Sequence, residues 1–185
     1  SITGVKENDL ANLQFTSGTT GFPKGCMLTH RYWLLSGYLQ AQFMEISSDD
    51  INMTAQPYYY LDPMIQTMIC IISGISLVIM PRFSTSKFWQ TVKDNNVTVF
   101  YCIGSMILYL MRLEENPDIE KSHKLRIIYT SGLPPNFHEA VEKRWNVPVR
   151  ETYGSTESGP DLYVPIEDSE SVGSGAVGIA VCTKK

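Results

Sequence analysis

The sequence predicts an α/β fold with a mostly parallel β-sheet and helices on both of its faces. Short apolar segments alternate along the chain with amphipathic segments of helical length, and loops rich in Gly, Ser and Thr follow several of the apolar segments. Strands that alternate with helices of about 10–15 residues indicate βαβ units, whose strands run parallel. In such sheets a ligand binds beyond the carboxyl ends of the strands, where we expect the Gly/Ser/Thr loops at 17–25, 131–136 and 153–160 to converge.

Residues with a clear positional preference mark the boundaries of the elements. Thr29 is a good helix N-cap. Asp62 followed by Pro63 is typical of an N-cap and first helical residue, and Gly74 is typical of the end of the same helix. The segment 97–102 is β-branched and aromatic, as strands are. We therefore expect strands at 10–16, 51–56, 75–80, 97–102, 125–130 and 147–152, helices at 30–44, 62–74, 84–95, 105–115 and 134–145, and a charged surface connection at 116–124.

Composition excludes several classes of protein. With 185 residues, 43% of them hydrophobic and 18% charged, the chain is globular, and a net charge of −4 argues against a nucleic-acid-binding face or a basic membrane patch. Cys26, Cys70, Cys102 and Cys182 are far apart and lack zinc-site spacing, so we expect reduced thiols in a cytoplasmic protein. Polar residues interrupt the apolar stretch 64–80, which we interpret as a buried helix and a buried strand rather than a membrane span.

The segment 15–25, Phe-Thr-Ser-Gly-Thr-Thr-Gly-Phe-Pro-Lys-Gly, carries the strongest chemical signal. It combines four hydroxyl side chains, three glycines and one lysine. Glycines let backbone N–H groups turn inward to form an anion-binding concavity, the hydroxyls add donors, and Lys24 adds positive charge, which together suit a polyphosphate. The segment is not a Walker A loop, because Gly25 stands where that motif needs Ser or Thr.

Three segments in order along the chain resemble the adenylate-forming superfamily, which includes acyl-CoA synthetases, peptide-synthetase adenylation domains and beetle luciferases. Residues 15–25 resemble its phosphate loop, residues 130–134 (Thr-Ser-Gly-Leu-Pro) its adenine-site segment, and residues 153–157 (Tyr-Gly-Ser-Thr-Glu) a second signature. The resemblance covers essentially the whole chain and implies the fold of the large amino-terminal domain of these enzymes. Within the superfamily, Phe88-Trp89 and the Ser-Gly-Leu-Pro-Pro run are most similar to crotonobetaine/carnitine-CoA ligases.

The resemblance implies an ATP-dependent acyl-CoA ligase. The carboxylate of a small acid attacks the α-phosphorus of ATP, pyrophosphate leaves, and coenzyme A then takes the acyl group. Tyr153 would stack on adenine, Thr156 would bind the α-phosphate, and Glu157 would bind Mg²⁺. The other implied nucleotide-binding residues are Thr16, Ser17, Gly18, Thr19, Thr20, Gly21 and Lys24 at the phosphates, and Ser131, Gly132, Leu133, Pro134, Gly154 and Ser155 around adenine, with Lys24 counted as catalytic beside Thr156 and Glu157.

By the same resemblance, the carboxylic acid is expected beside Tyr59 and Tyr60, with Gly104 in the pocket wall. Family members often have histidine where this chain has Tyr60, so a role specific to histidine does not carry over. Asp62 is a candidate partner for a cationic acyl group such as a betaine, although helix capping explains Asp62 equally well and is the preferred interpretation.

The resemblance also implies that residues 1–185 are the central part of the large amino-terminal domain, without the mobile carboxyl-terminal domain and its catalytic lysine. Apolar surface at 64–80 and 105–111 would then be partly exposed and favour a homodimer. Two alternatives remain open at this point: an adenylation domain that loads a carrier protein, and an adenine-nucleotide-binding module without catalysis.

We predict that the 185-residue chain alone does not form an acyl-adenylate at a useful rate. ATP–pyrophosphate exchange, measured with Mg²⁺ and a panel of small carboxylic acids, should stay at the level of a protein-free control. Exchange above that level with any of the acids would contradict the prediction.

Overall fold

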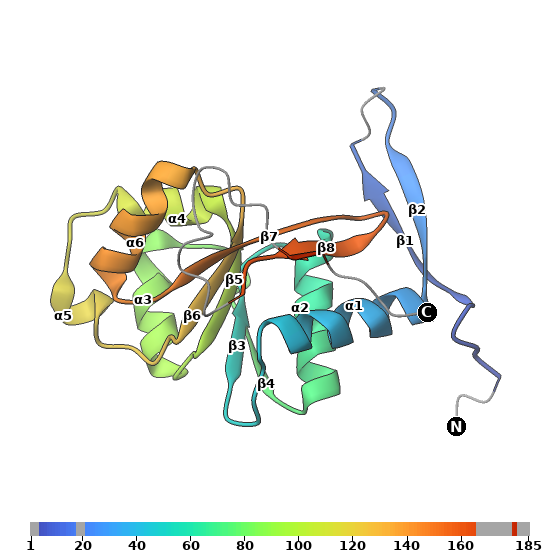
Figure 1. Ribbon diagram of the computed structural model, residues 1–185, viewed down its shortest axis with the longest axis horizontal. Helices are drawn as coiled ribbons and strands as arrows, with labels where there is room; N and C mark the ends of the chain where they lie inside the picture. The colour runs from blue at the N-terminus through green and yellow to red at the C-terminus, as the bar shows by residue number, and fades with distance from the viewer. Residues whose placement is uncertain (1–3, 18–20, 166–178, 181–185) are drawn as a thin grey trace.

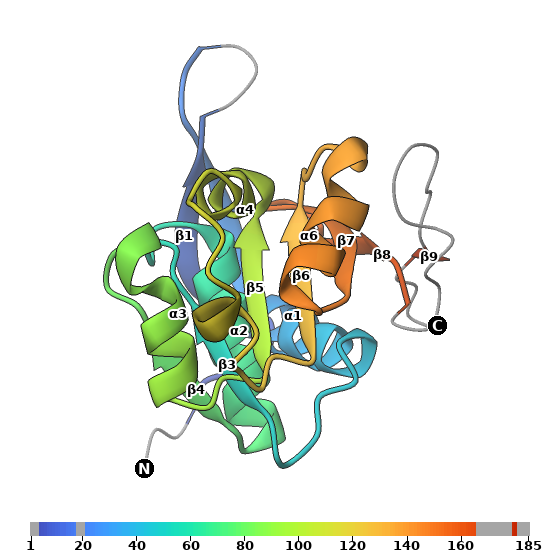
Figure 2. The same cartoon turned by 90° about the vertical axis from the view of Figure 1, so that its left-hand side faces the viewer.

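The computed structural model of the chain describes residues 4–17, 21–165 and 179–180. In this part of the chain, seven strands form one sheet between two layers of helices (Figures 1 and 2). The predicted fold class is confirmed. The strands of the sheet are β3 (Ile51–Thr54), β4 (Ser76–Ile79), β5 (Val99–Ile103), β6 (Ile127–Ser131), β7 (Val149–Ser155), β8 (Gly159–Tyr163) and β9 (Ile179–Ala180). The helices are α1 (His30–Phe43), α2 (Leu61–Ser73), α3 (Thr85–Asp94), α4 (Gly104–Met111), α5 (Pro117–Glu120) and α6 (His138–Trp145), with a 3₁₀ turn at Pro135–Phe137.

The order of the strands, β4-β3-β5-β6-β7-β8-β9, reverses direction at β3. From β3 the chain passes through α2 to β4 on one side, and then through α3 to β5 on the other side. The strands from β4 to β7 are parallel, whereas β8 and β9 are antiparallel to their neighbours. A reversal of this kind leaves a crevice at the carboxyl ends of the strands, between connections that leave on opposite faces.

Alternate residues of the central strands serve the two faces of the sheet. Val99 and Tyr101 of β5 pack with α1 and α2, whereas Phe100 and Cys102 pack with α3, α4 and α6. Both faces are apolar because helices cover both, as expected for a parallel sheet.

Several predicted boundaries are confirmed. Thr29 caps α1 by accepting a hydrogen bond from the amide of Tyr32 at 3.2 Å, and Gly74 ends α2 in the left-handed conformation. The apolar stretch 64–80 does form a helix and a strand, but the strand, β4, lies at the sheet edge and Ile79 is half exposed. Its prediction as a buried strand is therefore wrong.

Other local predictions are also wrong. The N-cap of α2 is Tyr60, and Asp62 is the second residue of the helix, so Asp62 is not a cap. The connection 116–124 contains the short helix α5 and a buried Glu120, which pairs with Arg144. Three strands were not predicted: β8, β9, and β2 (Lys24–Thr29), which pairs with β1 (Leu10–Thr16).

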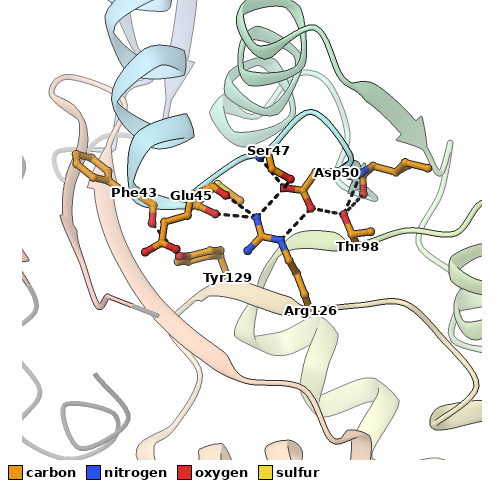
Figure 3. Close-up of polar contacts among 9 residues, drawn as sticks. Phe43, Glu45, Ser47, Asp50, Thr98, Arg126 and Tyr129 are labelled. Carbon is orange, nitrogen blue, oxygen red and sulfur yellow. Dashed lines mark hydrogen bonds and ion pairs between the residues drawn. The ribbon is translucent and has the colours of Figure 1, made fainter. Parts of the chain in front are cut away.

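Arg126 joins three elements at the amino ends of the strands (Figure 3). Its guanidinium donates to both carboxylate oxygens of Asp50, at 2.9 and 2.7 Å, and to the carbonyl oxygens of Met44 and Glu45 at the end of α1. Thr98 donates to the same carboxylate at 2.6 Å. Asp50 is 4% exposed, so these contacts satisfy a carboxylate that water does not solvate.

No helix in the described ranges has the length and apolarity needed to cross a bilayer. Apolar side chains are exposed on α2 and α4, including Ile71, Ile72 and Tyr109. The predicted exposure of these segments is confirmed, and the homodimer stays a prediction.

Replacing Arg126 by methionine should lower the free energy of unfolding by roughly 2–4 kcal/mol, because the buried Asp50 carboxylate loses its counter-ion. Urea denaturation at neutral pH measures this change. Arg31→Met is the matched control: Arg31 pairs with Glu7 on the surface and should contribute about 0–1 kcal/mol.

The pH dependence of the difference in unfolding free energy between wild type and Arg126→Met tests whether the ionised Asp50 carboxylate causes that difference. Burial alone would raise the pKa of Asp50, but hydrogen bonds from Arg126, the Ser47 amide and Thr98 outweigh burial and lower the pKa to about 2. An unfolded Asp titrates near pH ~3.9, so the stabilisation is complete above that pH and is lost as the pH falls towards about 2. A difference between wild type and Arg126→Met that stayed constant across this window would contradict the assignment.

Candidate functional site

A cavity of about 270 Å³ lies at the carboxyl ends of the central strands, beside the reversal at β3. The start of α2, strand β5, the end of β6 and the β7–β8 hairpin all contribute side chains to it. Of the residues expected from the sequence, six line the cavity: Tyr60, Ser131, Tyr153, Gly154, Ser155 and Thr156. Lining residues that the sequence analysis missed include Gln40, Tyr101 and Thr152.

Hydroxyl groups connect three strands at the floor of the cavity. The Tyr101 hydroxyl lies 3.2 Å from Thr152 Oγ1 and 3.4 Å from Ser131 Oγ, and Ser131 Oγ donates to the carbonyl of Thr152 at 2.7 Å. Burial, together with the Asp62 carboxylate nearby, raises the pKa of Tyr101, so its hydroxyl stays protonated and can donate. The network fixes Ser131 and Thr152 relative to β5.

Glu151 holds the turn that follows β6. Its carboxylate accepts hydrogen bonds from the backbone amides of Gly132 at 3.0 Å and Leu133 at 3.1 Å, and His138 Nε2 lies 3.2 Å from it. Gly132 has φ +77°, a conformation that glycine adopts without strain. The carboxylate therefore replaces the hydrogen-bond partners that the turn lacks.

Gly104 is placed where a side chain cannot fit. A Cβ at this position would lie 2.4 Å from the carbonyl oxygen of Gly132 and 2.5 Å from the amide nitrogen of Leu133. The start of α4 thus packs directly on the turn after β6. Gly104 supports that turn from behind and is absent from the cavity lining, unlike the pocket-wall position predicted for it.

The phosphate-loop segment is at the tip of a separate two-stranded sheet formed by β1 and β2 (Figure 1). Thr16 pairs with Lys24 at the end of the hairpin, and Phe22 is 83% exposed. The described residues of the segment, 15–17 and 21–25, do not line the cavity, and Gly18, Thr19 and Thr20 lie outside the described residues. The predicted convergence is confirmed for the 153–160 loop and, in the 131–136 loop, for Ser131 alone; it is wrong for the described part of the 17–25 loop. The reason is that the antiparallel hairpin extends away from the parallel sheet.

The start of α1, which follows directly from β2, contacts the β7–β8 turn. Tyr32, in the first turn of α1, donates a hydrogen bond to the carbonyl of Thr156 at 3.0 Å. Burial and the adjacent Glu157 carboxylate raise the pKa of the Cys26 thiol in β2. Glu157 follows Thr156 in the chain but, unlike Thr156, it does not line the cavity.

Glu157 is the described residue that the sequence predicts as a magnesium ligand. Among the described residues, no group of three or more His, Cys, Asp or Glu side chains could hold a metal ion alone. Mg²⁺ in nucleotide sites commonly uses one or two carboxylates together with phosphate oxygens and water. Glu157 is an exposed single carboxylate next to Thr156 and could supply one such ligand.

On the opposite side, the cavity is bounded by the start of α2. Tyr60 lines it, and Tyr59 packs on Tyr60 with ring centroids 4.5 Å apart. Gln14 of β1 donates a hydrogen bond to the Tyr59 carbonyl, which ties this segment to the hairpin. Tyr59 itself is 69% exposed and is absent from the lining.

Replacing Gly104 by alanine should destabilise the protein by roughly 1–3 kcal/mol, because the new methyl group meets backbone atoms that cannot rotate away. Thermal and urea unfolding measure the loss. Gly25→Ala is the control: its nearest contacts are with the Phe15 ring, from 3.4 Å, which is ordinary packing distance. Equal stability of the two variants would contradict the close approach.

Comparison with known proteins agrees with this arrangement. The AMP-binding enzyme family matches residues 2–184. Crotonobetaine/carnitine–CoA ligase of Proteus mirabilis is 33% identical over 158 residues, which are 84% of this chain and 30% of that protein. Long-chain fatty acid transport protein 5 of Homo sapiens is 32% identical over 86% of this chain and 23% of its own length. ATP-bound MatB from Rhodopseudomonas palustris superposes with a TM-score of 0.84 at 23% identity, over 96% of this chain and 35% of MatB. The chain spans about a third or less of these proteins, and because the family match covers nearly all of it, the chain belongs to the AMP-binding enzyme family.

Proposed function

We propose that this chain is the nucleotide-binding part of an ATP-dependent acyl-CoA ligase. The reaction would activate a carboxylic acid as its acyl-adenylate, with release of pyrophosphate, and transfer the acyl group to coenzyme A. One observation carries the proposal: Ser131 at the end of β6 and the 153–156 segment meet in a single cavity at the carboxyl ends of parallel strands. The name of the Proteus mirabilis relative, a ligase of a carboxylic acid and coenzyme A, supports the same reaction.

The exposed Tyr153 ring and the polar groups beside it suggest which end of the cavity would bind adenosine. Tyr153 is 63% exposed, which leaves a ring face free to stack on adenine. Ser131, Gly154 and Ser155 would surround the base, with Gly132, Leu133 and Pro134 shaping the turn behind it. Aromatic stacking with a polar surround binds adenine without a charged partner.

The phosphate end lies towards the hairpin. Thr156 would donate to the α-phosphate, and Glu157 would hold Mg²⁺, which neutralises charge on the phosphates. Thr16, Ser17, Gly21 and Lys24, with residues 18–20, would hold the outer phosphates. Because adenylation joins two anions, these groups would act mainly by positioning and charge neutralisation.

The partners are a small carboxylic acid, placed beside Tyr60, and coenzyme A as acceptor. Cys26, Cys70 and Cys102 are free thiols. This supports the predicted cytoplasmic location, which stays a prediction.

Replacing Tyr153 by alanine should weaken AMP binding by roughly tenfold or more, the loss expected for one stacking contact. Isothermal titration calorimetry of the chain with AMP, and with ATP and Mg²⁺, measures the affinities. Tyr109→Ala is the matched control, because Tyr109 is an exposed tyrosine on α4 that does not line the cavity. If wild type bound neither nucleotide, or if both variants bound AMP equally well, the assignment of the adenine site would fail.

A further inference from the structure

Three buried amide side chains form a hydrogen-bonded chain that ends at the cavity. Asn52 of β3 donates from Nδ2 to Oε1 of Gln66 at 2.8 Å, and Gln66 of α2 donates from Nε2 to Oε1 of Gln40 at 3.1 Å. Asn52 and Gln66 are fully buried, and Gln40 of α1, which lines the cavity, is 5% exposed. The oxygen of the last amide in the chain is therefore occupied by Gln66.

The NH2 group of Gln40 is left without a partner. Its Nε2 makes no hydrogen bond with any other residue that the structure describes. Because the amide oxygen is turned to Gln66, the NH2 group is the part of this side chain that remains for a ligand in the cavity. A ligand that covers this donor without accepting its hydrogen bond leaves a desolvated polar group, which costs free energy. A ligand with an acceptor at this point avoids that cost.

The neighbours of Gln40 on α1 show where the donor lies along the cavity. Tyr32, Ser36 and Gln40 are four residues apart and so share one face of the helix. Tyr32 donates to the carbonyl of Thr156, and the hydroxyl of Ser36 would lie 2.9 Å from a Cβ on Gly159. Gln40 follows Tyr32 by two helical turns, roughly 12 Å. In the proposed ligase the acid presents its carboxylate at the Thr156 end, so Gln40 would meet the acyl chain away from that carboxylate.

The α2 side of the cavity limits the kind of acceptor that fits. Leu61 and Ile65 line it with apolar surface suited to an acyl chain, and Asp62 lies one turn before Gln66. The Asp62 carboxylate would repel a second carboxylate on the same acid. A neutral acceptor, such as a ketone oxygen, would meet the Gln40 amide without that repulsion.

We infer that Gln40 is a specificity-determining residue that selects carboxylic acids with a neutral hydrogen-bond acceptor in the acyl chain. Asn52 and Gln66 hold its amide so that the NH2 group faces the ligand. The inference rests on the proposed function and narrows the acid that the ligase would activate.

The test uses straight-chain keto acids whose ketone lies progressively farther from the carboxylate. Each keto acid is paired with the acid of the same shape in which a methylidene group replaces the ketone oxygen. Both are titrated calorimetrically into the 185-residue chain saturated with AMP. At the ketone position that reaches Gln40, wild type should bind the keto acid roughly fivefold more tightly than its partner, the gain expected for one hydrogen bond. Gln40→Met, which lacks the donor, should bring that ratio close to one.

Gln42→Met is the matched control, because Gln42 is exposed on the same helix and lies outside the cavity lining; it should keep the wild-type ratio. The wild-type series is decisive even if Gln40→Met does not fold. AMP binding with equal affinity for the two acids of every pair, or with no binding of any acid, overturns the role of Gln40 and leaves the nucleotide site intact. A ketone preference that persists in Gln40→Met overturns it as well. Failure of AMP itself to bind overturns the proposed function, and the inference with it.

Discussion

The pairing of Arg126 with Asp50 sets the register on which the site depends. It lies at the amino ends of the strands, and Thr98, which donates to Asp50, also accepts a hydrogen bond from the amide of Ile51 (Figure 3). The amide of Thr98 in turn donates to the Ile51 carbonyl, and the Arg126 amide donates to Thr98. These contacts lock β3, β5 and β6 to one another. Because a slip of one residue moves every side chain to the other face of a strand, they also decide that Tyr101 faces the cavity and Cys102 the core.

At the carboxyl ends of the strands, the same register brings the start of α4 against the turn after β6 and brings the hydroxyl groups of β5, β6 and β7 together. Gly104 begins α4 directly against the turn at Gly132, which a side chain would prevent. Glu151 holds the amides of that turn from β7, while Tyr101 connects to Ser131 and Thr152. The positions that resemble family signatures are therefore supported by residues outside those signatures. Their geometry depends on three strands at once, and this explains why one cavity collects residues from segments that are far apart in sequence.

The sequence predicted the parallel core of the fold well, because its periodic apolar segments and helix boundaries are local signals. Thr29 and Gly74 are at the ends of helices as expected. Strands β2 and β8 were missed since both contain glycine, lack an alternating apolar pattern and gain their structure by pairing with β1 and β7, and β9 has only two residues. Asp62 was misassigned for a related reason: its residue type suits an N-cap, but the helix begins two residues earlier than the Asp-Pro pair indicates. Tyr101 carried no local sign of its role, since an aromatic residue in a buried strand is ordinary, and only the register of β5 against β6 turns its hydroxyl towards Ser131.

The two halves of the proposed site are mechanically connected through the start of α1. Strand β2 leads without interruption into α1, whose Tyr32 holds the carbonyl of Thr156. Gln14 of β1 holds the carbonyl of Tyr59 on the other side of the cavity. Strand β1 and the start of α1 thus contact the proposed acid-binding end and the proposed α-phosphate contact, although the tip of the hairpin extends away from the sheet (Figure 1). In the proposed ligase, the placement of the hairpin would therefore be coupled to the alignment of the acid with the nucleotide.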